Sequence, residues 1–169
     1  MKIKIKNMKN KFLIIVSLLS LTAFTCTRES DDKHHFIHFY NSADYDIFVH
    51  QSYDYPDTSS YGGDVTTPGW NLKVESHHSN NDAIWSRGTY ESQLREDTLI
   101  IFVFNADTLS TYGWNYVKDH NIVTQRYYLS LSDLYNLKWC LSFPPTEDMR
   151  DIKMWPPYGT YGHNGYRIN

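Results

Sequence analysis

The sequence predicts a single α+β domain made mostly of antiparallel strands, with one or two short helices within residues 109–137 packed on the sheet. From Phe36 onward, short apolar or alternating segments are separated by clusters of Asn, Asp, Ser, Gly and Pro, a pattern typical of strands and turns. Residues 99–104 form a continuous apolar run, and Ser130 with Asp133 forms a helix-start signal. The alternative is an all-β sandwich.

The first two strands are expected over residues 36–40 and 47–53. Residues 41–44, Asn-Ser-Ala-Asp, lie between them and predict a hairpin. Residues 55–64 follow and are dense in Pro, Asp, Ser and Gly, which are turn-forming residues. A long loop is therefore expected after the second strand.

The next segment alternates in polarity. Leu72 and Val74 alternate with lysine and glutamate, which predicts a half-buried strand, and residues 79–82 predict a turn toward residues 83–86. Residues 89–95 fit either a short helix or irregular backbone.

Residues 99–104, Leu-Ile-Ile-Phe-Val-Phe, predict a central strand. Six consecutive apolar residues without alternation are too short for most helices and suit a strand covered on both faces. A second sheet or helices must then pack on each side of this strand.

The second half of the domain is expected to mix helical turns with strands. Residues 112–117 fit one or two helical turns that end at residues 120–121, and residues 122–128 return as a strand. Ser130 can cap a helix while Asp133 bonds back to it. Residues 139–143 alternate with aromatic residues inward, which predicts a last strand ended by two prolines.

The N-terminus has the layout of a secretory signal. Five lysines lie within the first 11 residues, and the apolar run 12–24 follows before Cys26. The run is shorter than the ~18 residues that span a membrane as a helix. A permanent transmembrane anchor and a start at Met8 are the weighed alternatives.

Ala23-Phe24-Thr25-Cys26 resembles a lipobox, the site where a lipoprotein signal peptidase cuts before a diacylated cysteine. The polar, acidic residues 27–33 resemble the tether of surface lipoproteins from Bacteroidetes-type bacteria. The resemblance implies a lipid on Cys26 that holds the protein at the outer membrane. An ordinary secreted or periplasmic protein is the alternative.

The predicted organisation follows from this site. Residues 1–25 are the signal peptide, 26–35 a flexible acidic tether, 36–145 the β-rich globular domain, and 146–169 an aromatic tail rich in Pro and Gly, expected to lack regular structure. The domain is long enough for a substantial core.

Removal of residues 1–25 makes the chain acidic. Eleven basic residues remain against nineteen acidic ones, a net charge of about −8. This balance argues against nucleic acid as a partner, because Lys and Arg neutralise phosphates there. The remaining partners are a membrane through the lipid, and a glycan or protein.

The chain has two cysteines. If Cys26 carries lipid, Cys140 remains alone and the mature domain holds no internal disulfide. The alternative, a disulfide between Cys26 and Cys140, would tie the leader to a core strand.

Much of the mature chain also resembles a group of small, uncharacterised Bacteroidetes-type surface lipoproteins. The matching segments are Tyr55-Pro56-Asp57-Thr58, Ile101-Phe102-Val103-Phe104, Ala106-Asp107-Thr108-Leu109, Trp114, Arg126-Tyr127, residues 129–134, Leu137-Lys138-Trp139 and Pro144. These are turn, cap and core residues. The resemblance implies the location and a single domain, and it brings no catalytic residue.

No residue pattern indicates an enzyme or a cofactor. The chain offers no Gly-x-Ser-x-Gly, His-Glu-x-x-His or phosphate-loop motif. His35 and His38, or His34 and His38, could share a metal with Asp31 or Asp32, but a solvated tract and strand alternation explain them more simply. No metal site is therefore assigned.

The aromatic tail suggests binding. Fourteen tyrosines and five tryptophans exceed the needs of a core of this size, and Trp155, Tyr158 and Tyr161 are the candidate ligand residues. Asp57, Asp64 or Asn164 could serve as polar partners. In the alternative, the tail is a lid over the sheet. We expect a non-catalytic surface lipoprotein that binds or scaffolds; a glycan-binding accessory protein and a structural partner of an outer-membrane complex are the alternatives.

Overall fold

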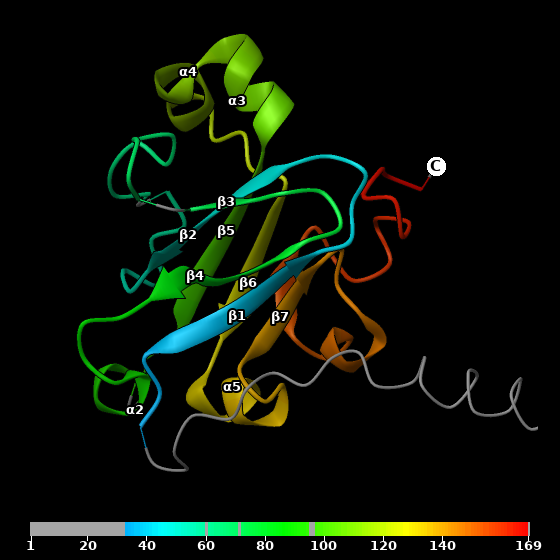
Figure 1. Ribbon diagram of the computed structural model, residues 1–169. Helices are drawn as coiled ribbons and strands as arrows, with labels where there is room; N and C mark the ends of the chain where they lie inside the picture. Colours follow the sequence, from blue (N-terminus) through cyan, green and yellow to red (C-terminus); the bar gives the residue numbers. More distant parts are fainter. Residues whose placement is uncertain (1–32, 60, 71, 95–96, 169) are drawn as a thin grey trace, which may run out of the picture.

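The computed structural model describes residues 33–59, 61–70, 72–94 and 97–168. These residues form two mostly antiparallel β-sheets that face each other, with short helices around them (Figure 1). The predicted α+β class is therefore confirmed. The facing sheets are the feature that the sandwich alternative anticipated, and the helices distinguish this fold from it.

The three-stranded sheet has the order β4-β1-β7. β1 is the central strand, antiparallel to β4 and parallel to β7. Its strands are β1 (Phe36–Asn41), β4 (Ser79–Trp85) and β7 (Cys140–Phe143).

The five-stranded sheet has the order β3-β2-β5-β6-β8 and is antiparallel throughout. β5 is its central strand, and β3 and β8 are its edges. Its strands are β2 (Ile47–Ser52), β3 (Lys73–Val74), β5 (Leu99–Asn105), β6 (Gln125–Leu129) and β8 (Lys153–Trp155).

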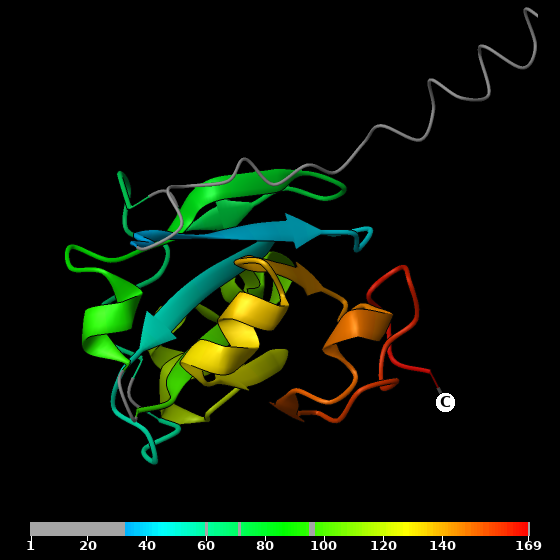
Figure 2. The same cartoon turned by 90° about the horizontal axis from the view of Figure 1, so that it is seen from below.

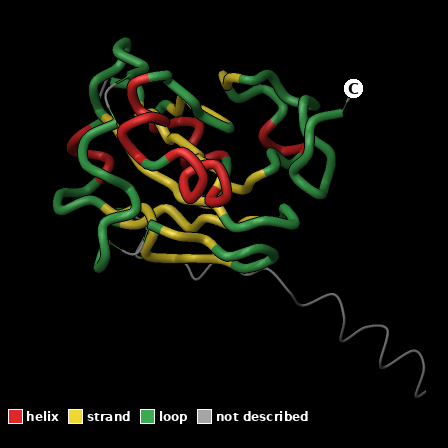
Figure 3. The backbone as a smooth tube through the Cα atoms, turned by 90° about the horizontal axis from the view of Figure 1, so that it is seen from above, coloured by secondary structure: helices red, strands yellow, loops and turns green. Residues whose placement is uncertain are grey.

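Short helices close the ends of the structure. α5 lies at the near end of the space between the sheets in Figure 2, and α3 and α4 lie at the opposite end, in front of the strands in Figure 3. The helices are α2 (Tyr90–Gln93), α3 (Ala106–Tyr112), α4 (Trp114–Asp119), α5 (Leu131–Asn136) and the 3-10 helix η1 (Glu147–Met149).

The prediction that β5 is covered on both faces is confirmed. Leu99, Ile101 and Val103 face the three-stranded sheet and belong to the main core between the sheets. Ile100, Phe102 and Phe104 point to the other face and form a second core with Tyr61, Trp114 and others. Burial on both faces explains why this strand shows no polar alternation.

The predicted hairpin over residues 36–53 is wrong. β1 and β2 belong to different sheets, and residues 42–46 carry the chain from one sheet to the other. The side chain of Asn41 makes this crossing possible. Its Nδ2 donates to the carbonyl oxygens of Tyr45 (2.8 Å), Val74 and Glu75 (both 3.2 Å), and its Oδ1 accepts from the backbone N–H of Ala43 (3.0 Å).

The predicted turn at residues 79–82 is also wrong, because these residues begin β4. β4 is an edge strand, so its polar residues lie at the surface without cost. Their composition therefore indicated a turn where the structure has a solvated strand.

The helix-start prediction is confirmed. The Ser130 hydroxyl accepts from the N–H of Asp133 (3.2 Å), and the Asp133 carboxylate accepts from the N–H of Ser130 (2.8 Å), which forms a complete capping box at α5. The helical turns expected at residues 112–117 are also present, interrupted by Gly113 with φ 77°.

Part of the C-terminal tail is regular. β8 pairs with β6, and an isolated bridge joins Tyr161 to Arg167. Asp44 donates from its N–H to Asn164 O (3.1 Å), and the Tyr45 hydroxyl donates to Gly165 O (2.7 Å). These bonds fasten the end of the tail to the connection between β1 and β2.

Candidate binding surface

The pairing of β6 with the edge strand β8 places two cations against aromatic rings. Arg126 lies opposite Trp155, and Tyr128 lies opposite Lys153. The alternation of a strand directs all four to the face of the second core, and Tyr55 from the loop after β2 lies beside them. We call Tyr55, Arg126, Tyr128, Lys153 and Trp155 the cation–aromatic patch.

Both cations contact rings of the patch. The Arg126 guanidinium carbon lies 4.9 Å from the centre of the Trp155 ring, and the Lys153 Nζ lies 5.3 Å from the centres of the Tyr55 and Tyr128 rings. Lys153 also donates a hydrogen bond to the Tyr55 hydroxyl at 3.1 Å. These contacts are attractive, because an aromatic face is electron-rich.

Two rings of the patch remain accessible. Trp155 is 46% exposed and Tyr55 is 40% exposed. Trp155 is the last residue of the edge strand β8, and Pro156 and Pro157 follow it. Prolines lack the N–H groups that would extend the sheet. A ligand can therefore reach these rings at an edge that cannot recruit a further strand through those two residues.

The structure separates the three ligand residues named from the sequence. Trp155 lies in the patch. Tyr158 is half-buried, donates to the Glu147 carboxylate (2.8 Å) and lies under Arg150. Tyr161 packs on the main core against Phe143, and its hydroxyl donates to Thr124 O (2.7 Å).

The proposed polar partners make local turns. The carboxylates of Asp57 and Asp64 each accept bonds from residues two positions later, and the Asn164 side chain accepts from the N–H of Tyr166. They shape their own loops.

The patch could not be found from sequence alone, since it depends on the register of β6 against β8. The signal was present as two cation–aromatic pairs at alternate positions, Arg126 with Tyr128 and Lys153 with Trp155. Nothing in the sequence shows that these two segments are neighbours.

No family model, no curated protein and no solved structure matches this chain. The site must therefore be interpreted from its own chemistry. Within the described ranges, no helix has the length and apolar character needed to cross a membrane.

A second group of exposed rings lies on α3 and α4. Tyr112 stacks on Tyr116 (5.2 Å between centres), and Tyr116 stacks on His120 (4.0 Å). Tyr112 and Tyr116 are 56% and 44% exposed, and their rings already stack on neighbouring rings of the same segment.

The three N-terminal histidines are held apart by separate contacts. The Nδ1 of His34 lies 2.5 Å from a Glu91 carboxylate oxygen, and its ring stacks on Trp139 at 4.0 Å. His35 Nδ1 lies 3.3 Å from Ser86 O, and His38 lies on β1. Among the described residues, no three His, Cys, Asp or Glu side chains are arranged to hold a metal ion.

The His34–Glu91 contact fastens the start of the folded chain. The backbone N–H of His34 also donates to both Glu91 carboxylate oxygens, at 3.1 and 3.2 Å. Burial acts to raise the pKa of Glu91, but the bonds from His34 outweigh it, so this pKa lies below its ordinary value. The contact is structural, and it leaves His34 stacked rather than open to a substrate.

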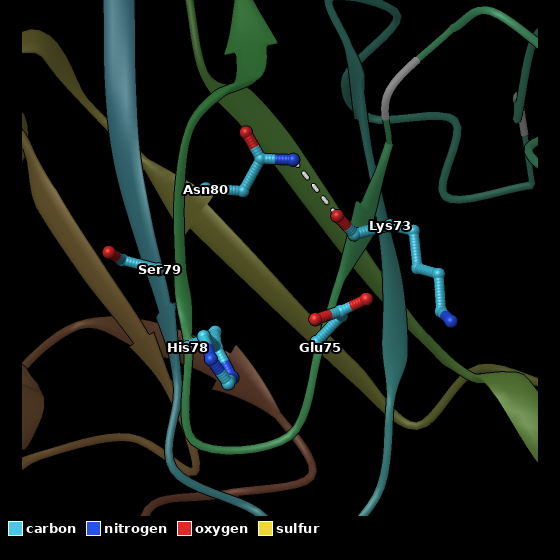
Figure 4. A pocket seen from close by; sticks show the side chains of 5 residues that line it. All are labelled: Lys73, Glu75, His78, Ser79 and Asn80. Carbon is cyan, nitrogen blue, oxygen red and sulfur yellow. Dashed lines mark hydrogen bonds between the residues drawn. The ribbon is translucent and has the colours of Figure 1, made fainter.

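A shallow hollow of about 350 Å³ lies between β3 and the start of β4 (Figure 4). It is lined by Lys73, Glu75, His78, Ser79 and Asn80. Lys73 pairs with Asp46 (2.7 Å). The Asn80 side chain donates to Lys73 O (2.9 Å) and so connects the start of β4 to β3. Lys73 and Asn80 are therefore used in local contacts, and we assign no ligand to the hollow.

Cys140, on β7, is a disulfide cysteine in the structure. The expectation that it remains alone is thereby corrected. The other cysteine of the chain, the predicted lipidation site Cys26, lies outside the described residues, as do the signal peptide and most of the tether.

Proposed function

We propose that this protein is a non-catalytic lipoprotein of the cell envelope, anchored to the outer membrane through Cys26, that binds a glycan through the cation–aromatic patch. The leader, the lipobox-like segment and the acidic tether support the anchor. The observation that carries the binding role is the exposed Trp155 ring beside Arg126 on a sheet edge.

Sugar binding suits this geometry. A pyranose presents a flat C–H face that packs on an aromatic ring, while its hydroxyl groups need donors and acceptors at the rim. Trp155 and Tyr55 supply accessible ring surface, and the Lys153 amine with the Tyr55 hydroxyl supplies the polar rim. The patch contains no nucleophile paired with a base, and we propose no reaction for it.

Trp155→Ala is expected to weaken glycan binding by more than about tenfold, because exposed tryptophans at binding surfaces carry a large share of the affinity. The measurement is retardation of the mature protein in native gels that contain neutral or acidic polysaccharides. The melting temperature should stay near that of wild type, since the Trp155 ring lies outside both cores.

Trp85→Ala is the matched control. Trp85 is 50% exposed and lies on β4 of the other sheet. The variant therefore removes a ring of the same kind and leaves the patch unchanged. Equal retardation of wild type and Trp155→Ala in every polysaccharide would contradict the binding role. Hydrolysis of a glycan or peptide panel by the purified protein would contradict the non-catalytic role.

Mass spectrometry of the mature protein tests the anchor. We expect a chain that begins at Cys26 and carries the mass of acyl chains. An unlipidated chain, or one cut elsewhere, would contradict the anchor, and Cys26→Ser should release the protein from membranes, since stable attachment needs more than one acyl chain.

A further inference from the structure

Arg126 is a buried positive charge with neutral partners. Its side chain is 6% exposed, and its Nη2 donates to the Tyr61 hydroxyl (3.4 Å) and to Asn121 Oδ1. Its Nε is buried without a hydrogen-bond partner, and the Trp155 ring lies over the guanidinium. Within the described residues, no carboxylate pairs with Arg126.

Such an arrangement is costly for folding alone. A buried charge is normally neutralised by a partner of opposite sign, because burial removes the water that stabilised it. The guanidinium keeps its charge even so, since arginine does not lose its proton in proteins. The described residues therefore leave the positive charge of Arg126 without a carboxylate, on the Trp155 side of the sheet edge.

Lys153 adds a second positive charge beside the first. It lies two residues before Trp155 on β8, is exposed, and contacts the Tyr55 and Tyr128 rings and the Tyr55 hydroxyl rather than a carboxylate of the described residues. The whole chain has nineteen acidic residues against sixteen basic ones. Two positive charges at one place on an otherwise acidic protein are complementary to a negative group on a ligand.

We propose that the glycan bound by this patch is acidic, with a carboxylate or sulfate group beside Lys153 while the adjacent sugar ring packs on Trp155. This inference rests on the proposed glycan binding and specifies that the ligand is negatively charged. Lys153 makes the direct ion pair, and Arg126, beneath the tryptophan ring, supplies a second charge in a medium where screening by water is weak.

The test compares ligands that differ in charge alone. Titration calorimetry of the detergent-solubilised mature protein uses an oligogalacturonate against its methyl ester, and a sulfated dextran oligosaccharide against unmodified dextran. At least one acidic member should bind about tenfold more tightly than its neutral counterpart. Near 1 M salt, where the screening length is ~3 Å, that preference should disappear.

Lys153→Gln should remove about tenfold of the affinity for the acidic ligand and leave that for the neutral ligand unchanged. Lys118→Gln, an exposed lysine on α4, makes the same change in net charge away from the patch and should have no effect. Arg126→Met should also lower the affinity for the acidic ligand. If this variant does not fold, the result for Lys153→Gln alone tests the proposed charge preference.

The outcomes separate the two proposals. If acidic and neutral ligands bind equally and Trp155→Ala abolishes both, glycan binding stands and the inference about charge is overturned. If none of the four ligands nor any polysaccharide in the gels binds, the proposed function itself fails. If Lys118→Gln weakens acidic binding as much as Lys153→Gln, the loss reflects the change in net charge and not a contact at Lys153, and the site at Lys153 is overturned.

Discussion

Asn41→Ala is expected to lower the free energy of unfolding by about 3 kcal/mol or more. The Asn41 side chain is fully buried and joins the end of β1 to the crossing segment and to β3 through three donated bonds and one accepted bond. Each buried group left without a partner costs about 1–3 kcal/mol. Chemical denaturation followed by tryptophan fluorescence measures the change.

Asn115→Ala is the matched control, because it deletes the same atoms from an exposed position on α4. Its effect should stay within about 0.5 kcal/mol. If Asn41→Ala were equally mild, the Asn41 bonds would not hold the two sheets together at this corner.

Gly165→Ala is expected to lower the free energy of unfolding by about 2–4 kcal/mol. Gly165 has φ +81°, where an L side chain is strained by about 1 kcal/mol. A Cβ there would lie 2.4 Å from the Ala43 Cβ and 3.1 Å from the Tyr45 ring, and overpacking adds about 1–3 kcal/mol. The denaturation midpoint should fall, and hydrogen exchange should rise at the end of the tail.

Gly159→Ala separates the two contributions. Gly159 has nearly the same φ, +82°, and a Cβ there meets nothing within 4 Å. It should cost about 1 kcal/mol, the conformational part alone. Equal losses in both variants would show that the tail does not pack tightly on the connection between β1 and β2.

Elements whose signals are local were predictable from sequence. β5 is a continuous apolar run that is too short for most helices. α5 begins with a capping box between two residues that are three positions apart. Each signal lies within its own short segment and does not depend on contacts with distant residues.

The failures arose where distant residues decide the structure. Residues 41–44 have the composition of a hairpin turn, but Asn41 bonds to Val74 and Glu75, more than thirty residues away. Residues 79–82 have the composition of a turn, but β1 supplies a partner that makes them an edge strand.

The candidate site divides in the same way. Trp155 was identified from composition, whereas Arg126 and Lys153 were missed because cross-strand register brings them to the rings. Tyr161 was grouped with Trp155 by its place in the tail, but its ring packs on the opposite face of the five-stranded sheet, in the main core. β8 ends at Trp155, so closeness in sequence did not place Tyr161 on the same face as Trp155.

The central position of β1 sets an order of events during folding. Its parallel partner β7 pairs His38 with Cys140 and Asn41 with Phe143, so about a hundred residues separate the two strands. Closing so long a loop costs entropy before any contact forms, and such non-local pairing slows folding. A chain that emerges from a pore with its N-terminus first must therefore hold β1 without this neighbour until residue 143 has followed, and the three-stranded sheet is completed only after most of the chain has emerged.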